Sequence, residues 1–302
     1  MSKKMQGNIM LLITAMIWGS AFVAQSKGMD YIGPFTYNTI RNFIGGLVLI
    51  PVILIMSKGK KEEAVLTAEE KKKQDKLLLI GGICCGAILF LASSFQQYGL
   101  VHTTAGKAGF ITALYIIIVP LLGIFMGRRV PRIIWCCVAL AIAGFWLLCI
   151  KEGFTVGLGD LMVLICSFFY SVHIMTIDHF SPRTDGVKLS CVQFFVAGVI
   201  SIVPMLLLEE PVFSAVLDAK WTILYAGVLS SGVAFTFQII AQRHTDPTVA
   251  TLLMSLESVF AALFGWIILK EGLLPKELFG CLLVFTAVIL AQIPLPAKSK
   301  KA

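Results

Sequence analysis

Charged residues are scarce in this chain of 302 residues: they make up 14% of it, against 58% hydrophobic residues, and the mean hydropathy is +0.89. A soluble globular chain carries about a quarter charged residues. The scarcity excludes an ordinary cytosolic enzyme, a disordered chain and a disulfide-rich secreted module. A membrane-spanning helix needs ~20 apolar residues, so ten would take up about two thirds of the chain. We therefore expect an all-α polytopic membrane protein with little mass outside the bilayer.

Motifs of chemistry are also missing from the sequence. It holds no His-Glu-x-x-His metal motif, no nucleotide-binding loop and no nucleophile elbow. The eight cysteines follow no metal or redox spacing, and the adjacent pairs 84–85 and 136–137 point to different helix faces. We expect no enzymatic activity, no catalytic residue, no metal and no cofactor. The net charge of +8 fits lysines that meet anionic lipid headgroups, rather than nucleic acid.

Hydropathy divides the chain into ten apolar segments, and the first reads as a retained helix rather than a cleaved signal. The polar stretch 57–76 reads as a solvated linker. The ten segments are roughly 7–27, 35–56, 77–97, 105–127, 132–150, 160–178, 188–208, 220–241, 247–269 and 275–293.

Lysine and arginine residues are unequally divided between the two faces that these segments define. The face that holds both termini and the 57–76 linker carries 18 of them, and the opposite face carries 5. Because positive residues concentrate on the cytoplasmic side, we expect both termini to lie in the cytoplasm. We expect the protein to lie in the plasma membrane.

The chain also repeats itself. Residues 95–123 match residues 237–265 at eight positions when shifted by 142, and Gly45 and Pro51 match Gly198 and Pro204 at a shift of 153. The two halves are thus 1–150 and 151–302, with five predicted spans each. Five is odd, so the second half enters the membrane from the other side. Ten transmembrane helices in two inverted five-helix repeats favour a transporter that works by alternating access.

Several short motifs resemble the EamA family of the drug/metabolite transporter superfamily. Residues 17–22 read IWGSAF, similar to the family's WGs-F opening, and Arg41 lies where its second span carries an arginine. Residues 256–259 (LESV) resemble its lEPv element, and 269–271 (LKE) its gE ending. There are two departures: Ser258 replaces the usual proline, and Arg128-Arg129 stand where the first-half glutamate would fall. The resemblance covers the whole chain and implies the same ten-span layout.

Two ionisable groups lie deep inside predicted spans, where charge is costly and usually functional. Glu257 is ten residues beyond Pro247, about 15 Å along a helix and hence near the bilayer midplane. We expect it to be protonated or paired with a cation, either to couple transport to protons or as a neutral hydrogen-bonding group. Arg41 lies about 10 Å deep. It can hold a substrate carboxylate or phosphate, or else cap carbonyl groups or snorkel outward.

Other candidates are a histidine, a lysine and aromatic side chains. His173 can relay protons or contribute to the solute site, or it can be a neutral core residue. Lys107 lies near the outer end of its span and is expected to snorkel. Aromatic residues near mid-membrane can form walls for an organic solute or can be ordinary packing residues. Tyr115 is also the repeat counterpart of Glu257. These aromatic residues are Trp18, Phe22, Tyr115, Phe169 and Tyr170.

The sequence thus predicts a secondary transporter, acting as an exporter, of small organic metabolites such as amino-acid-like solutes. Its expected partners are the solute, membrane lipid, protons and a second copy in a homodimer, and nucleic acid is not expected. The alternatives are an intramembrane enzyme, which needs paired catalytic groups at one depth, and a membrane sensor without flux, which would normally carry a soluble domain.

Overall fold

The computed structural model describes residues 2–59, 67–149, 157–269 and 275–292, and every regular element in these ranges is helical. The expected all-α fold class is confirmed. In chain order the elements are α1 (Lys3–Gly28), α2 (Pro34–Gly59), α3 (Ala68–His102), α4 (Ala105–Thr112), α5 (Tyr115–Phe125), α6 (Arg132–Cys149), α7 (Leu158–Phe180), η1 (Ser181–Arg183), α8 (Gly186–Leu208), α9 (Phe213–Asp218), α10 (Lys220–Leu224), η2 (Tyr225–Phe235), α11 (Thr236–Gln242), α12 (Pro247–Met254), α13 (Leu256–Leu269) and α14 (Pro275–Gln292).

Local capping signals set where several helices begin. The Ser2 hydroxyl accepts a hydrogen bond from the backbone N–H of Met5 at 3.2 Å and starts α1. Thr67 and Glu70 form a capping box at the start of α3, within the stretch that was expected to be a linker. Asp246 precedes α12 and accepts from the N–H of Thr248 at 2.9 Å. Such caps satisfy amide groups that have no partner within the helix.

The start of α2 is capped by a residue far away in the sequence. Glu209, which follows α8, accepts hydrogen bonds from the N–H of Phe35 at 2.8 Å and of Thr36 at 2.7 Å. The hydroxyl of Thr36 donates to the same carboxylate at 2.6 Å. A carboxylate at a helix N-terminus is favoured by the helix dipole, so this contact fixes the end of α8 against the start of α2.

Eight stretches of the described helices are long and apolar enough to cross a membrane. They coincide with the first four predicted segments and with the sixth to the ninth. The fifth and tenth segments form shorter apolar helices, Arg132–Gly144 in α6 and Leu278–Ala291 in α14. Of the ten predicted spans, eight are therefore confirmed within the described residues, and the fifth and tenth are apolar helices of shorter length.

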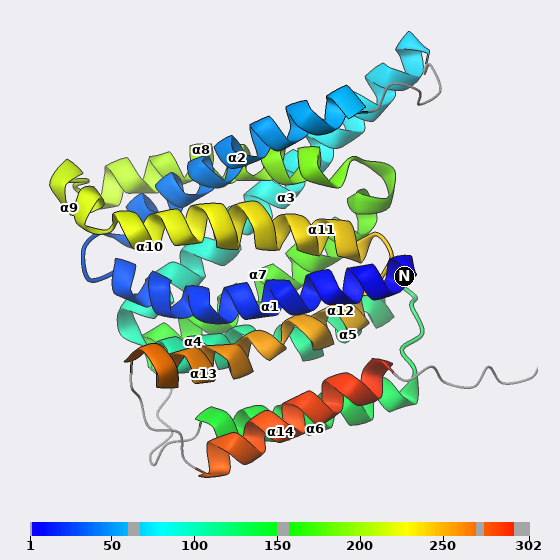
Figure 1. The fold of residues 1–302 in the computed structure, drawn as a ribbon, viewed down its shortest axis with the longest axis vertical. Coiled ribbons are helices and arrows are strands. Elements are labelled where there is room, and N and C mark those ends of the chain that lie inside the picture. The colour runs from blue at the N-terminus through cyan, green and yellow to red at the C-terminus, as the bar shows by residue number, and fades with distance from the viewer. Residues whose placement is uncertain (1, 60–66, 150–156, 270–274, 293–302) are drawn as a thin grey trace, which may run out of the picture.

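The closest helix pairs join the first half of the chain to the second. Figure 1 shows α6 beside α14 along one edge of the bundle, and α2 packs on α8 and α3 on α7. At the α6–α14 crossing, a Cβ atom on Gly144 would lie 2.6 Å from the carbonyl oxygen of Gly280, so only glycine permits this approach. The largest buried apolar cluster lies where the halves meet, around Leu11, Ile116 and Leu252. The halves are thus interlocked, and a site between them is built from both.

Candidate functional site

The fourth and ninth predicted segments are each broken into two half-helices. α4 ends and α5 begins around Ala113, and α12 ends and α13 begins around Ser255. These two positions are 142 residues apart, the offset of the internal repeat. The second break occurs although residue 258 is serine rather than proline, and the Ser258 hydroxyl donates to the carbonyl of Gly109 in α4 at 2.9 Å. Paired broken helices at mid-membrane are a common setting for a solute site.

A third irregular helix lies beside these breaks. Residues Tyr225–Phe235 form a π-helical segment, η2, between α10 and α11. Its backbone carbonyl groups receive hydrogen bonds from α1: Thr14 Oγ1 donates to Ala234 at 3.0 Å and Trp18 Nε1 to Ser230 at 3.4 Å. π-Helical turns are frequent at functional sites because they leave carbonyl groups for outside partners.

A cavity of about 30 Å³ lies between these elements. A water molecule needs ~10–15 Å³, so the cavity has room for about two waters. The side chains around it include one guanidinium, one carboxyl group, three amides and five aromatic rings. The cavity is lined by Trp18, Phe22, Gln25, Arg41, Gln96, Thr112, Tyr115, Tyr170, Ile174, Ser230, Phe235, Gln238 and Glu257.

Tyr115 and Glu257 meet at the centre of the site. The Tyr115 hydroxyl donates to Glu257 Oε1 at 2.8 Å, and both residues are about 2–3% exposed. They occupy the same position in the two repeats and lie in the first turns of α5 and α13. Two equivalent positions that touch must lie beside the axis relating the halves, so the cavity is at the centre of the repeat symmetry.

Arg41 lines the cavity on the side toward α1. It is 3% exposed, and its Nη1 donates to the side-chain oxygen of Gln25 at 2.5 Å. Gln25 is itself held by its own helix, since its Nε2 donates to the carbonyl of Ala21 at 3.2 Å. Arg41 Nε is buried and makes no hydrogen bond. The burial does not fit outward snorkelling, and the guanidinium retains a donor that an anionic group in the cavity can use.

His173 lies behind the cavity rather than in its wall. Its Nε2 is 3.1 Å from the side-chain oxygen of Gln193, and its ring meets the edge of Phe235 with 6.0 Å between ring centroids. It is completely buried. This geometry places His173 in the core next to a cavity residue, so a direct contact with solute is not available in this state. Phe169 also lies outside the wall and stacks on Phe95 at 5.7 Å.

The amide side chains of the cavity were not identified from the sequence. Gln96 Nε2 donates to Thr112 Oγ1 at 3.3 Å, and the Tyr170 hydroxyl donates to Gln96 Oε1 at 3.2 Å. Gln96 and Gln238 are one of the eight matched pairs of the internal repeat, and both line the cavity. The repeat therefore held the signal that could have found these two.

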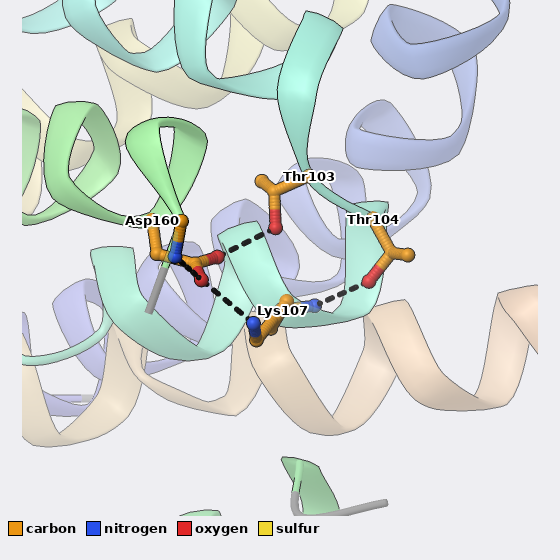
Figure 2. Close-up of polar contacts among 5 residues, drawn as sticks. Thr103, Thr104, Lys107 and Asp160 are labelled. Atoms are coloured by element: carbon orange, nitrogen blue, oxygen red, sulfur yellow. Dashed lines mark hydrogen bonds and ion pairs between the residues drawn. The ribbon is translucent and has the colours of Figure 1, made fainter. Parts of the chain in front are cut away.

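Lys107 does not line the cavity, and the structure gives it a carboxylate partner. Its Nζ forms an ion pair with Asp160 Oδ2 at 2.6 Å, in the first turn of α4 (Figure 2). Its side chain is 25% exposed and that of Asp160 is 7% exposed. Asp160 was not singled out because it lies at the edge of its apolar segment, where a charge is ordinary.

Within the described ranges, no three histidine, cysteine, aspartate or glutamate residues are grouped as a metal site would require. What the cavity offers is one cationic group, one carboxyl group and amide donors and acceptors on an aromatic wall. Such a set suits a small organic solute that has both an ionic group and apolar surface.

Comparison with known proteins supports a transporter. The profile of the EamA-like transporter family matches residues 5–150 and again 157–292. An uncharacterized transporter of Archaeoglobus fulgidus is 30% identical over 297 residues, covering 96% of this chain and 87% of the relative. The uncharacterized transporter YoaV of Bacillus subtilis is 24% identical, covering 93% and 94%. A chloroplastic WAT1-related protein of Arabidopsis thaliana is 22% identical, covering 92% and 67%. A crystal structure with 18% identity superimposes with a TM-score of 0.76 over 95% of this chain and 96% of the other, which shows a shared fold.

Proposed function

This chain belongs to the EamA-like transporter family, and we propose that it is a secondary transporter that exports small organic metabolites, amino-acid-like solutes among them, across the plasma membrane. One observation supports this most directly. A buried guanidinium and a buried carboxyl group line one cavity between two inverted halves, beside paired helix breaks. Such a site serves both orientations of a transporter, since the halves can exchange conformations around it.

The proposed cycle begins from a closed state. A cavity of about 30 Å³ has no room for a metabolite, so loading requires the helices around it to separate on one side. Separation on the inner side admits the solute, and separation on the outer side releases it. With the termini proposed to be cytoplasmic, the residue 28–34 and 102–105 turns lie on the outer side.

Arg41 is proposed to bind the anionic part of the solute. Its Nε has no hydrogen bond, while its Nη1 is held by Gln25, so the guanidinium is oriented but not saturated. The aromatic residues Trp18, Phe22, Tyr115 and Tyr170 are proposed to contact the apolar part of the solute. Arg41→Lys keeps the charge and loses the planar fork, so we expect weaker solute binding in a folded protein.

Glu257 is proposed to couple solute movement to protons. It is the cavity's carboxyl group, and it can exchange a proton with whichever side of the membrane is open. The Tyr115 hydroxyl bonds one of its oxygens and leaves the other available. His173 is proposed to hold the cavity wall in place from behind, through the contact of its ring with Phe235, rather than to bind the solute directly.

The experiment uses protein reconstituted in liposomes. A thermal-shift screen of amino acids, nucleosides, amines and sugars first identifies a solute, and counterflow of the labelled solute then tests for transport. An intramembrane enzyme or a sensor without flux would show no counterflow. With an imposed proton gradient alone, Glu257→Gln should still bind the solute but fail to concentrate it. Accumulation by Glu257→Gln equal to that of the parent would assign the residue to packing.

Homodimer formation is part of the same proposal, and it is tested separately. Cross-linking in membranes at increasing dilution of protein in lipid would report it. A cross-linked fraction that falls steadily as the protein is diluted in lipid would reflect crowding, and a fraction that stays constant over the same dilution would support a dimer.

A further inference from the structure

The broken helix α4–α5 is joined to α7 by an ion pair at each end. At the outer end Lys107 of α4 pairs with Asp160 of α7, with 2.6 Å between Nζ and Oδ2. At the inner end Arg128, just after α5, pairs through Nη2 with Asp178 Oδ2 near the end of α7. Both contacts cross from the first half of the chain to the second.

Hydrogen bonds reinforce the outer contact. Figure 2 shows the side chains of Thr103 and Lys107 converging on Asp160. Thr103 Oγ1 donates to Asp160 Oδ1 at 2.7 Å, and the N–H of Gly157 donates to Oδ2 at 2.9 Å. The Thr104 hydroxyl accepts from the backbone N–H of Lys107 at 3.3 Å, which fixes the first turn of α4. The lysine therefore approaches a carboxylate that is already held in place.

A tight turn positions the inner contact. Gly127 has a positive φ of 79°, a conformation that other residues rarely adopt, and it ends α5. The N–H of Arg128 then bonds the carbonyl of Gly123 at 2.9 Å. This turn directs the Arg128 side chain back toward α7, where its side chain stays 38% exposed and that of Asp178 is 14% exposed.

The two ion pairs lie on opposite sides of the cavity. Along the broken helix α4–α5, Thr112 and Tyr115 of the cavity wall lie between Lys107 and Arg128. Along α7, the wall residues Tyr170 and Ile174 fall between Asp160 and Asp178. The wall formed by these two helices is therefore fastened above and below the site.

The helix pair related to it by the repeat, α12–α13 with α1, is built differently. By the repeat offsets, Gly7 is the counterpart of Asp160 and Val249 is the counterpart of Lys107. A Cβ atom on Gly7 would lie 3.1 Å from Thr245 Oγ1. The counterpart of Asp178 is Gln25, which bonds Arg41. The counterpart of Arg128 lies outside the described residues. At the inner end of this second pair, the two positions that correspond to Lys107 and Asp160 therefore carry no charged residue.

We propose that the two ion pairs are the outer and inner locks of one gate, formed by α4–α5 against α7. Both locks are closed in the present state, and each open state requires one of them to separate. The inference rests on the proposed alternating access to the cavity. It adds that access is controlled on this pair of helices, and that the outer lock, with more hydrogen bonds and deeper burial, is the stronger.

The test measures access to the cavity and needs no solute. Ser230→Cys places a thiol in the cavity wall with little change in size, and Ser230 comes from η2, outside the gate. A membrane-impermeant sulfonated maleimide is applied to right-side-out and to inside-out membrane vesicles. The labelling rate of the same lock variant without Ser230→Cys is subtracted, which removes reaction at native cysteines. A reporter fused after Ala302 assigns the two faces independently.

Each lock variant serves as the control for the other. Lys107→Met should raise the labelling rate from the outer face about fivefold, the effect of losing an interaction of about 1 kcal/mol, and leave the inner rate unchanged. Arg128→Met should raise the inner rate by a smaller factor and leave the outer rate unchanged. The charge-conserving Lys107→Arg and Arg128→Lys should label at close to the parent rates.

Equal increases from both faces, increases from the wrong face, or no change in folded variants would overturn the proposal. Should Lys107→Met not fold, Thr103→Val removes one hydrogen bond to Asp160 with little change in shape and should raise the outer rate alone, less strongly. Should Arg128→Met not fold, Asp178→Asn tests the inner lock in the same way. A protein without counterflow can still pass this test, so failure of transport and failure of the locks are distinguishable.

Discussion

Gly19 lies where α1 closely approaches α13, and replacing it with alanine should destabilise the protein. A Cβ atom at this position would lie 2.5 Å from Phe260 Cβ, 2.7 Å from the carbonyl oxygen of Glu257 and 2.8 Å from the backbone nitrogen of Ala261. Two of these three atoms belong to the backbone of α13 and cannot turn away. The helices must therefore separate.

The magnitude follows from the geometry. Ordinary contacts of a Cβ atom begin at 3.4 Å, so the shortest of the three distances falls short by 0.9 Å. Overpacking of this kind costs ~1–3 kcal/mol. The higher helix propensity of alanine returns up to ~1 kcal/mol. We expect a net loss of about 1–2 kcal/mol in the free energy of unfolding, which corresponds to a fall of roughly 2–8 °C in the unfolding midpoint.

Thermal unfolding of purified protein in detergent measures the effect, and two other glycines provide matched controls. A Cβ on Gly106 of α4 would meet no atom within 4 Å, so Gly106→Ala should leave the midpoint unchanged or raise it slightly. A Cβ on Gly109 would meet Ala261 and Phe22 at 3.6 Å, an ordinary contact, so Gly109→Ala should fall between the two. A midpoint for Gly19→Ala at or above that of Gly106→Ala would refute the reasoning.

Three further predictions concern topology, capping and the cavity. Reporters fused after Ala302 or inserted in the 57–76 linker should both give a cytoplasmic signal, because of the 18-to-5 charge bias, and an external signal from either would contradict the proposed orientation. Glu209→Ala should lower the unfolding midpoint through a loss of about 1–2 kcal/mol, since three donors at the start of α2 lose their acceptor, whereas the exposed neighbour Glu210→Ala should have no effect. Tyr115→Phe should cost about 1–3 kcal/mol by removing the hydrogen bond to the buried Glu257, and an unchanged midpoint relative to the exposed control Tyr31→Phe would show that the bond contributes nothing.

Much of the architecture could be predicted from the sequence because it is written in long-range patterns. Apolar runs of about 20 residues mark the helices, since the bilayer selects for length and composition. The repeat offset of 142 residues places Tyr115 and Glu257 at equivalent positions, and in the structure these two side chains are hydrogen-bonded to each other. The family resemblance and the all-helical fold followed from the same patterns and are confirmed.

Other features depend on helix rotation and packing, which hydropathy does not report. The helix breaks near Ala113 and Ser255 leave no trace in an apolar run, because both half-helices are apolar. His173 and Tyr170 lie three residues apart on α7, yet only Tyr170 reaches the cavity wall. The pairing of Lys107 with Asp160 joins residues from different halves, and no periodicity within either helix indicates which carboxylate the lysine meets.

The contact between Tyr115 and Glu257 has a consequence for how the two halves can be related to each other. If either half formed an antiparallel homodimer around the same axis, this position would face its own copy. Copies of the first half would set phenol against phenol, and copies of the second would set two carboxyl groups against each other, where they cannot both be ionised. Two unlike halves, as in this chain, are needed to place a donor opposite a single acceptor. The two halves differ at this point, and the axis accordingly holds one carboxyl group, so the proposed coupling would move at most one proton through this group in each passage.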